Sequence, residues 1–67
     1  MFVIASRHPA FGKLFLGRDR PVATKKAAIR FRSEESAQER IEFWRGLLAK
    51  GEPLDPKFFG GMYVEQA

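Results

Sequence analysis

The stretch SEESAQERIEFWRGLLAKG, residues 33–51, is the strongest structural signal in this chain of 67 residues. Its apolar residues recur every three or four positions, as on one face of a helix: Ala37, Ile41, Trp44 and Leu48, with Phe43 and Leu47 widening the stripe. Ser33 is a favourable N-cap, and Gly51 stands where a left-handed residue commonly ends a helix. The pattern predicts one long amphipathic helix from about Glu34 to Lys50.

Short apolar runs on both sides of this helix predict strands. They are Phe2–Ala5, Lys13–Leu16 and Met62–Glu65. The connection Arg7–Gly12 contains a proline and a glycine and suits a hairpin loop. For residues 24–31 we favour a short turn capped by Thr24 over an extended segment. We therefore expect a single α+β domain over residues 1–67, of the type ββαβ, with a three-stranded antiparallel sheet in the order 2-1-3 and the helix on one face.

The second face of this sheet needs a cover. The run Phe2–Ala5 is apolar at every position, whereas a sheet with one solvated face should alternate apolar and polar residues. Either Phe58 and Phe59 wrap around to the second face or another protein chain covers it. We favour the first of these explanations.

Charge is divided unequally along the chain. Residues 1–32 carry eight of the 12 Lys and Arg residues and one acid, and residues 33–67 carry four bases and seven acids. The two halves thus have net charges of +7 and −3, which together give +4. The chain has no cysteine, which excludes disulfides and thiolate metal sites. Without a signal-peptide core or an apolar run of about 20 residues, the sequence predicts a cytoplasmic protein that does not enter a membrane.

Residues suited to catalysis are few. His8 is the only histidine, and no acid lies near it in the sequence. The serines lack a nucleophile-elbow context, and the glycines form no phosphate loop. Glu35, Glu39 and Glu42 follow one side of the expected helix, as on a solvated face. We therefore expect a protein that is not an enzyme and that uses no metal or cofactor.

Binding is the better-supported class of function. The chosen partner-binding residues combine cations with an aromatic side chain: Arg7, His8, Phe11, Lys13, Arg18 and Arg20. Lys25, Lys26, Arg30 and Arg32 form a second basic patch. We expect a larger protein or nucleoprotein with an acidic surface as the partner, and Phe11 is either an interface residue or a lid on the core. Two alternatives remain open: binding of nucleic acid through the same cations, and a small homo-oligomer.

The residues from Phe2 to Ile41 resemble a pattern found in short proteins of phages and prophages. The pattern is a hairpin, a small turn and then A-x-x-F-x-S-x-E-x-A at a helix entry, here Ala28–Ala37. Such ββα(β) proteins include accessory factors and inhibitors, anti-CRISPR proteins among them. The resemblance implies a protein that inhibits or modulates a complex of the host cytoplasm by binding. It assigns no functional residues, because the matching positions are structural.

Overall fold

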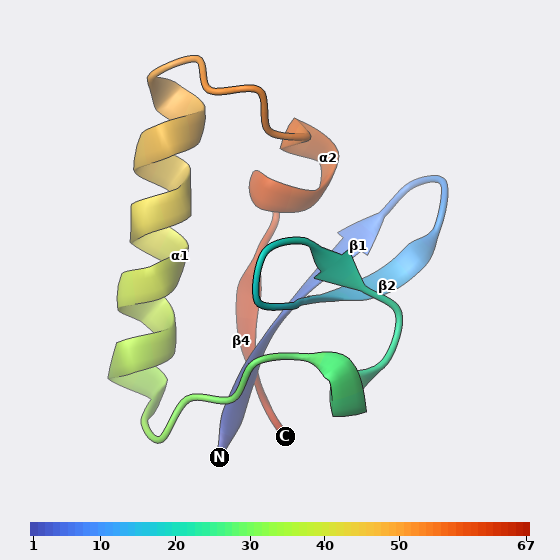
Figure 1. The fold of residues 1–67 in the computed structure, drawn as a ribbon, viewed down its shortest axis with the longest axis vertical. Coiled ribbons are helices and arrows are strands. Elements are labelled where there is room, and N and C mark those ends of the chain that lie inside the picture. Colours follow the sequence, from blue (N-terminus) through green and yellow to red (C-terminus); the bar gives the residue numbers. More distant parts are fainter.

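A four-stranded antiparallel sheet and one long helix make up this α+β domain, for which a computed structural model describes residues 1–67 (Figure 1). The elements in chain order are β1 (Phe2–His8), β2 (Gly12–Leu16), β3 (Pro21–Val22), the 3-10 turn η1 (Lys25–Ala27), α1 (Glu34–Ala49), α2 (Pro56–Phe59) and β4 (Tyr63–Gln66). The strand order is β3-β2-β1-β4. The predicted neighbours of the first strand are therefore confirmed, and η1 begins after Thr24 as expected.

The ββαβ prediction was incomplete at two places. The sequence analysis did not predict the two-residue strand β3, which pairs with the end of β2. A tight turn makes this pairing possible: the Gly17 N–H donates to the Arg20 carbonyl oxygen at 2.8 Å, and a Cβ on Gly17 would lie 2.7 Å from that oxygen. The loop after α1 contains the one-turn helix α2, capped by Asp55 and begun by Pro56. Elements of two and four residues are too short to produce a periodic pattern in the sequence.

Helix α1 begins and ends as its sequence predicts. The Ser33 hydroxyl oxygen accepts a hydrogen bond from the Ser36 N–H at 3.1 Å. At the other end Gly51 has a φ of +87°, and the Glu52 N–H donates to the Leu47 carbonyl oxygen at 3.2 Å, as in a Schellman motif. Phe43, expected to widen the buried stripe, is 58% exposed instead. Its ring lies edge-on against that of Trp44, with centroids 5.6 Å apart.

The face of the sheet that α1 and α2 cover is called the helix face here; it carries Phe2, Ile4, Ser6, His8, Leu14 and Leu16. Ile4 and Leu16 form a core with Ala37 and Ile41 of α1 and with Phe58, Phe59 and Met62. The Ser6 hydroxyl is completely buried and donates to the Phe58 carbonyl oxygen at 2.7 Å. This bond fixes α2 against β1, so the core closes at both ends.

The opposite face is called the open face; it carries Val3, Ala5, Arg7, Lys13 and Phe15, with Tyr63 and Glu65 directly across from Ala5 and Val3. Its apolar cluster is small and is closed by Ala28 and Val22 of the segment that follows β2. The prediction that Phe58 and Phe59 cover this face was wrong, because both side chains belong to the helix-face core. The chain covers part of the face with small residues from around η1.

Candidate functional site

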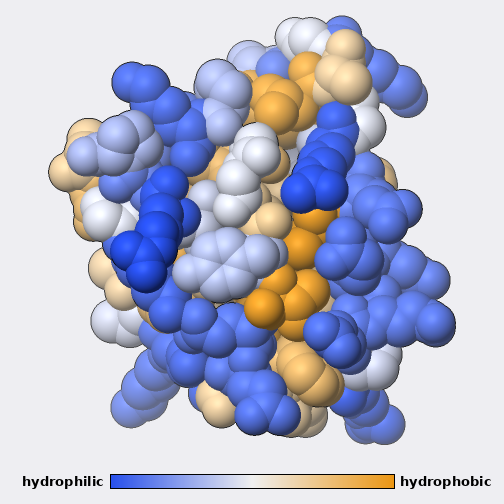
Figure 2. Space-filling model, turned by 180° about the vertical axis from the view of Figure 1, so that it is seen from behind, coloured by the Kyte–Doolittle hydropathy of each residue, from blue (hydrophilic) through white to orange (hydrophobic).

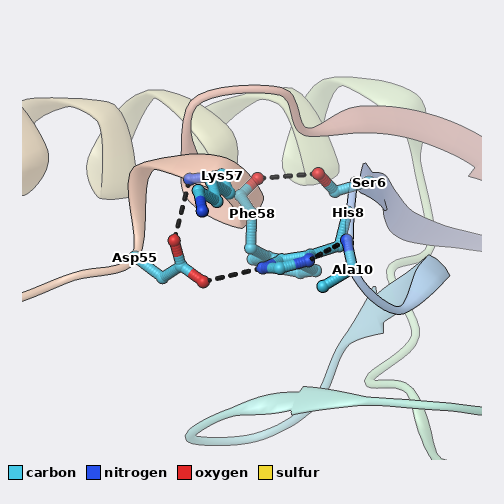
Figure 3. A network of polar contacts seen from close by, with 6 residues as sticks. All are labelled: Ser6, His8, Ala10, Asp55, Lys57 and Phe58. Atoms are coloured by element: carbon cyan, nitrogen blue, oxygen red, sulfur yellow. Dashed lines mark hydrogen bonds and ion pairs between the residues drawn. The ribbon is translucent and has the colours of Figure 1, made fainter.

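His8 is the last residue of β1 and is buried on the helix face, with only 7% of its surface exposed. Its Nε2 lies 2.9 Å from Asp55 Oδ2, and its Nδ1 accepts a hydrogen bond from the Ala10 N–H at 3.0 Å (Figure 3). Because Nδ1 accepts, the ring is neutral in this arrangement and Nε2–H is the donor to Asp55. The sequence analysis found no acid near His8, since Asp55 is 47 positions away.

The carboxylate of Asp55 is held in its ionised form. The Lys57 backbone N–H donates to Oδ1 at 2.9 Å, and this bond and the one from His8 lower the pKa of Asp55 below its ordinary value. Ser6, His8 and Asp55 nevertheless do not form a catalytic triad, in which the serine hydroxyl would donate to the imidazole. Ser6 donates to a backbone carbonyl, and both ring nitrogens of His8 have other partners. The network joins β1 to α2 and shapes the hairpin loop.

Phe11 lies in that loop and is 72% exposed, so it is not a lid on the core. Its ring has one aromatic neighbour, the His8 ring, with centroids 4.9 Å apart. Of the two roles that the sequence left open for Phe11, the structure removes the buried one. An aromatic ring held in water by a rigid neighbour is a typical anchor for a partner surface.

An ion-pair network crosses the open face. The Nζ atoms of Lys13 and Lys25 lie 2.5 and 3.0 Å from the two carboxylate oxygens of Glu65. These two bonds, first that of Lys13 and then that of Lys25, lower the pKa of Glu65 below its ordinary value. Lys13 also lies 5.6 Å from the centre of the Phe15 ring, and Lys25 donates to the Gln66 carbonyl oxygen. The network therefore forms a polar cover over the small apolar cluster.

Six cations of the N-terminal half form no ion pair, and all are exposed: Arg7, Arg18, Arg20, Lys26, Arg30 and Arg32. Arg7 lies on the open face, directly across from Lys13. Arg30 lies between Ile29 and Phe31, which pack against the helix-face core. Since side chains alternate along extended backbone, Arg30 points toward the open-face side. Glu65 is the one acid among these cations on the open face.

The structure regroups the residues that the sequence proposed for partner binding. Arg7 and Lys13 stay together on the open face, whereas His8 is buried on the helix face and the exposed Phe11 ring lies against it. Arg18 and Arg20 lie in the turn at the far end of β2. Of the second basic patch, Lys25 is tied to Glu65 and Arg30 joins Arg7 on the open-face side; Lys26 and Arg32 are exposed beside them in the sequence.

Sequence reasoning missed Asp55, Tyr63 and Glu65. The Asp55-Pro56 pair was a usable signal, because an N-cap followed by proline commonly starts a helix. No local pattern could have paired Glu65 with Lys13, because 52 positions separate them.

Part of the apolar surface lies in a strip on one side of the molecule. Seen from behind, an uneven strip of hydrophobic residues runs between flanks of hydrophilic ones (Figure 2). An apolar strip with a charged rim has the composition of a protein interface.

No group of three or more His, Asp or Glu residues is placed to hold a metal ion. Neither helix has the length and apolar character needed to cross a membrane. We found no protein-family model, curated protein or solved structure that matches the chain.

Proposed function

We propose that this protein is a non-enzymatic binding module whose open face docks onto an acidic surface of a larger protein or nucleoprotein. The observation that carries the proposal is the separation of charge across the sheet. Two exposed cations without an internal partner, Arg7 and Arg30, lie on the open-face side, while the acids of the C-terminal half lie mostly on the outer side of α1. Such an arrangement steers an acidic partner to one face and repels it from the other.

The cations of the open face that have no internal partner are arginines, which can make specific contacts with an acidic partner as well as attract it. Arg7 and Arg30 present guanidinium groups, which bind carboxylates through two parallel hydrogen bonds. Tyr63, which is 36% exposed on the same face as Arg7, supplies an aromatic contact there. Arginine and aromatic side chains are the residue types that dominate binding energy at protein interfaces.

The resemblance to phage accessory proteins suggests which partner to test first. A host complex would be the target, and inhibition or modulation would be the consequence of occupying its acidic surface. This part of the proposal is independent of the charge argument and is tested by naming the captured partner.

The test is an affinity pull-down from the native host, with and without nuclease, using matched charge reversals. Arg7→Glu with Arg30→Glu should weaken capture roughly tenfold or more, because two attractive contacts become repulsive. Arg45→Glu with Lys50→Glu changes the net charge equally, in α1 and at its C-cap, and should leave capture unchanged. Thermal melts of both variants should match the wild type. Equal loss in the two variants would show that net charge, and not the open face, governs binding.

A second candidate is binding of nucleic acid through the same face. The observation in its favour is that Arg7, Arg30 and the two lysines of the network lie on this face with a single acid, Glu65. Labelled single- and double-stranded DNA and RNA should then bind with a log affinity that falls linearly with log salt. Absence of binding at about 50 mM salt, where phosphate contacts are strong, would eliminate this candidate. Capture that survives nuclease treatment would favour the protein partner.

A further inference from the structure

A cleft opens between the hairpin loop, β3 and α2, on the side of the hairpin away from the open face. Its volume is about 510 Å³, within the range of clefts that hold small ligands or single side chains. The walls are mainly apolar and include Phe11, Leu14, Pro21, Val22 and Phe58. The polar side chains at its lining are His8 and Asp55, which Figure 3 shows facing one another.

The polar side chains of this cleft offer free hydrogen-bond acceptors and no free donors. Both ring nitrogens of His8 are occupied, Nε2 by Asp55 and Nδ1 by the Ala10 N–H. Asp55 receives one hydrogen bond at each oxygen and is 49% exposed, so its carboxylate keeps further acceptor sites toward solvent. A ligand that fits must therefore bring a donor, and a cation fits best.

We propose that this cleft receives a lysine or arginine side chain of the partner, with the aliphatic stem against Phe11 and Pro21 and the cationic group on Asp55. The shape of the cleft matches such a side chain, which is apolar along its length and charged at its tip. The lowered pKa of Asp55 keeps the carboxylate charged over the neutral range. Phe11 adds a ring over which a guanidinium or ammonium group is favourably placed.

This inference deepens the proposed function and rests on it, because it names a contact that the same partner would make. The partner would offer acids to the open face and one cation to the cleft. The two contacts use different residues, so each can fail alone.

The test needs no identified partner. The full-length protein, labelled with ¹⁵N, is titrated with Nα-acetyl-lysine N-methylamide and Nα-acetyl-arginine N-methylamide while backbone amide shifts are recorded. We expect saturable millimolar binding, with shifts at Ala10, Phe11, Val22 and Asp55. Nα-acetyl-norleucine N-methylamide, which has the stem without the charge, should bind about three- to tenfold more weakly, as should the cationic probes with Asp55→Asn.

Two variants separate the cleft from the rest of the surface. Asn is as good an N-cap as Asp, so Asp55→Asn keeps α2 while removing the charge. Ala23→Trp should fill the cleft and abolish the shifts, and Ala27→Trp, an exposed alanine outside the cleft, should leave them unchanged.

Three results would overturn the inference: equal binding of norleucine, preference for an acetyl-glutamate probe, or no saturable shift with any probe. If the cleft fails while the Arg7 and Arg30 reversals still abolish capture, the proposed function stands without this contact. If the reversals have no effect while the probes bind, the cleft is a site of its own and the open-face proposal fails.

Discussion

The two faces of the sheet are covered in different ways. On the helix face, α1 and α2 place large side chains such as Ile41 and Phe58 over Ile4 and Leu16. On the open face, Val3, Ala5 and Phe15 meet only Ala28 and Val22, and the lysines bound to Glu65 lie over them. Burial of large apolar side chains contributes far more free energy than an exposed ion pair. The difference teaches that the helix face contributes most of the stability of the fold, while the open face is closed only by small residues and an ion-pair network.

The largest effect should come from truncating the helix-face core. Phe58 is completely buried, so Phe58→Ala should cost about 3–5 kcal/mol, which approaches the whole free energy of unfolding expected for so small a domain. Phe15→Ala makes the same change on the open face and should cost about 2–3 kcal/mol, because its gap can relax toward solvent. Chemical denaturation followed by circular dichroism measures the free energy of unfolding of both variants. Equal losses of stability would show that the two faces contribute equally to the fold.

A smaller loss should follow from Ser6→Ala. The substitution leaves the Phe58 carbonyl oxygen without its 2.7 Å hydrogen bond in a buried setting, at a cost of about 1–3 kcal/mol. Amide hydrogen exchange should show faster exchange in α2 than in α1. Uniform acceleration across the chain would mean that Ser6 does not join α2 to β1 as described.

Removing the N-cap of α1, the helix that covers the helix face, should lower the free energy of unfolding by about 1 kcal/mol. Ser33→Ala deletes the acceptor for the Ser36 N–H, whereas Ser33→Asp keeps one and should restore stability. Urea midpoints of the three proteins provide the measurement. A Ser33→Asp variant no more stable than Ser33→Ala would contradict the capping role.

The smallest effect on stability should come from Glu65 on the open face, and it should depend on pH. The folded-state pKa of Glu65 lies below its ordinary value of 4.5, so the unfolded chain binds more protons as the pH falls through that range, and acid favours unfolding. The stabilisation is present above about pH 4.5 and is lost below it. Glu65→Gln should lower stability near neutral pH by less than about 1 kcal/mol and flatten the acid dependence.

Measurement of unfolding free energy between about pH 7 and about pH 3 would test this point. The pKa of Asp55 is also lowered, so Asp55 should contribute a second loss of unfolding free energy in acid. This loss should persist in Glu65→Gln and disappear in Asp55→Asn. An unchanged acid profile in both variants would show that neither carboxylate is linked to folding.

The sequence by itself determined helix α1, including its two ends. Local causes sufficed there: the hydroxyl of Ser33, the left-handed φ available to Gly51 and the periodic Ala37 and Ile41 all act within a few residues. The pairing of β1 with β2 also followed, because a short connection favours antiparallel neighbours, and β4 lies on the other side of β1 as expected.

Only the tertiary structure decided what covers the open face and which candidate residues share a surface. The partners of His8 and Lys13 lie 47 and 52 positions away, so no local pattern contains those contacts. The side of the sheet on which a cation points depends on strand register, and a shift of one residue reverses it. The sequence thus specified charges and elements through short-range chemistry, while long-range pairing chose the face that each charge occupies.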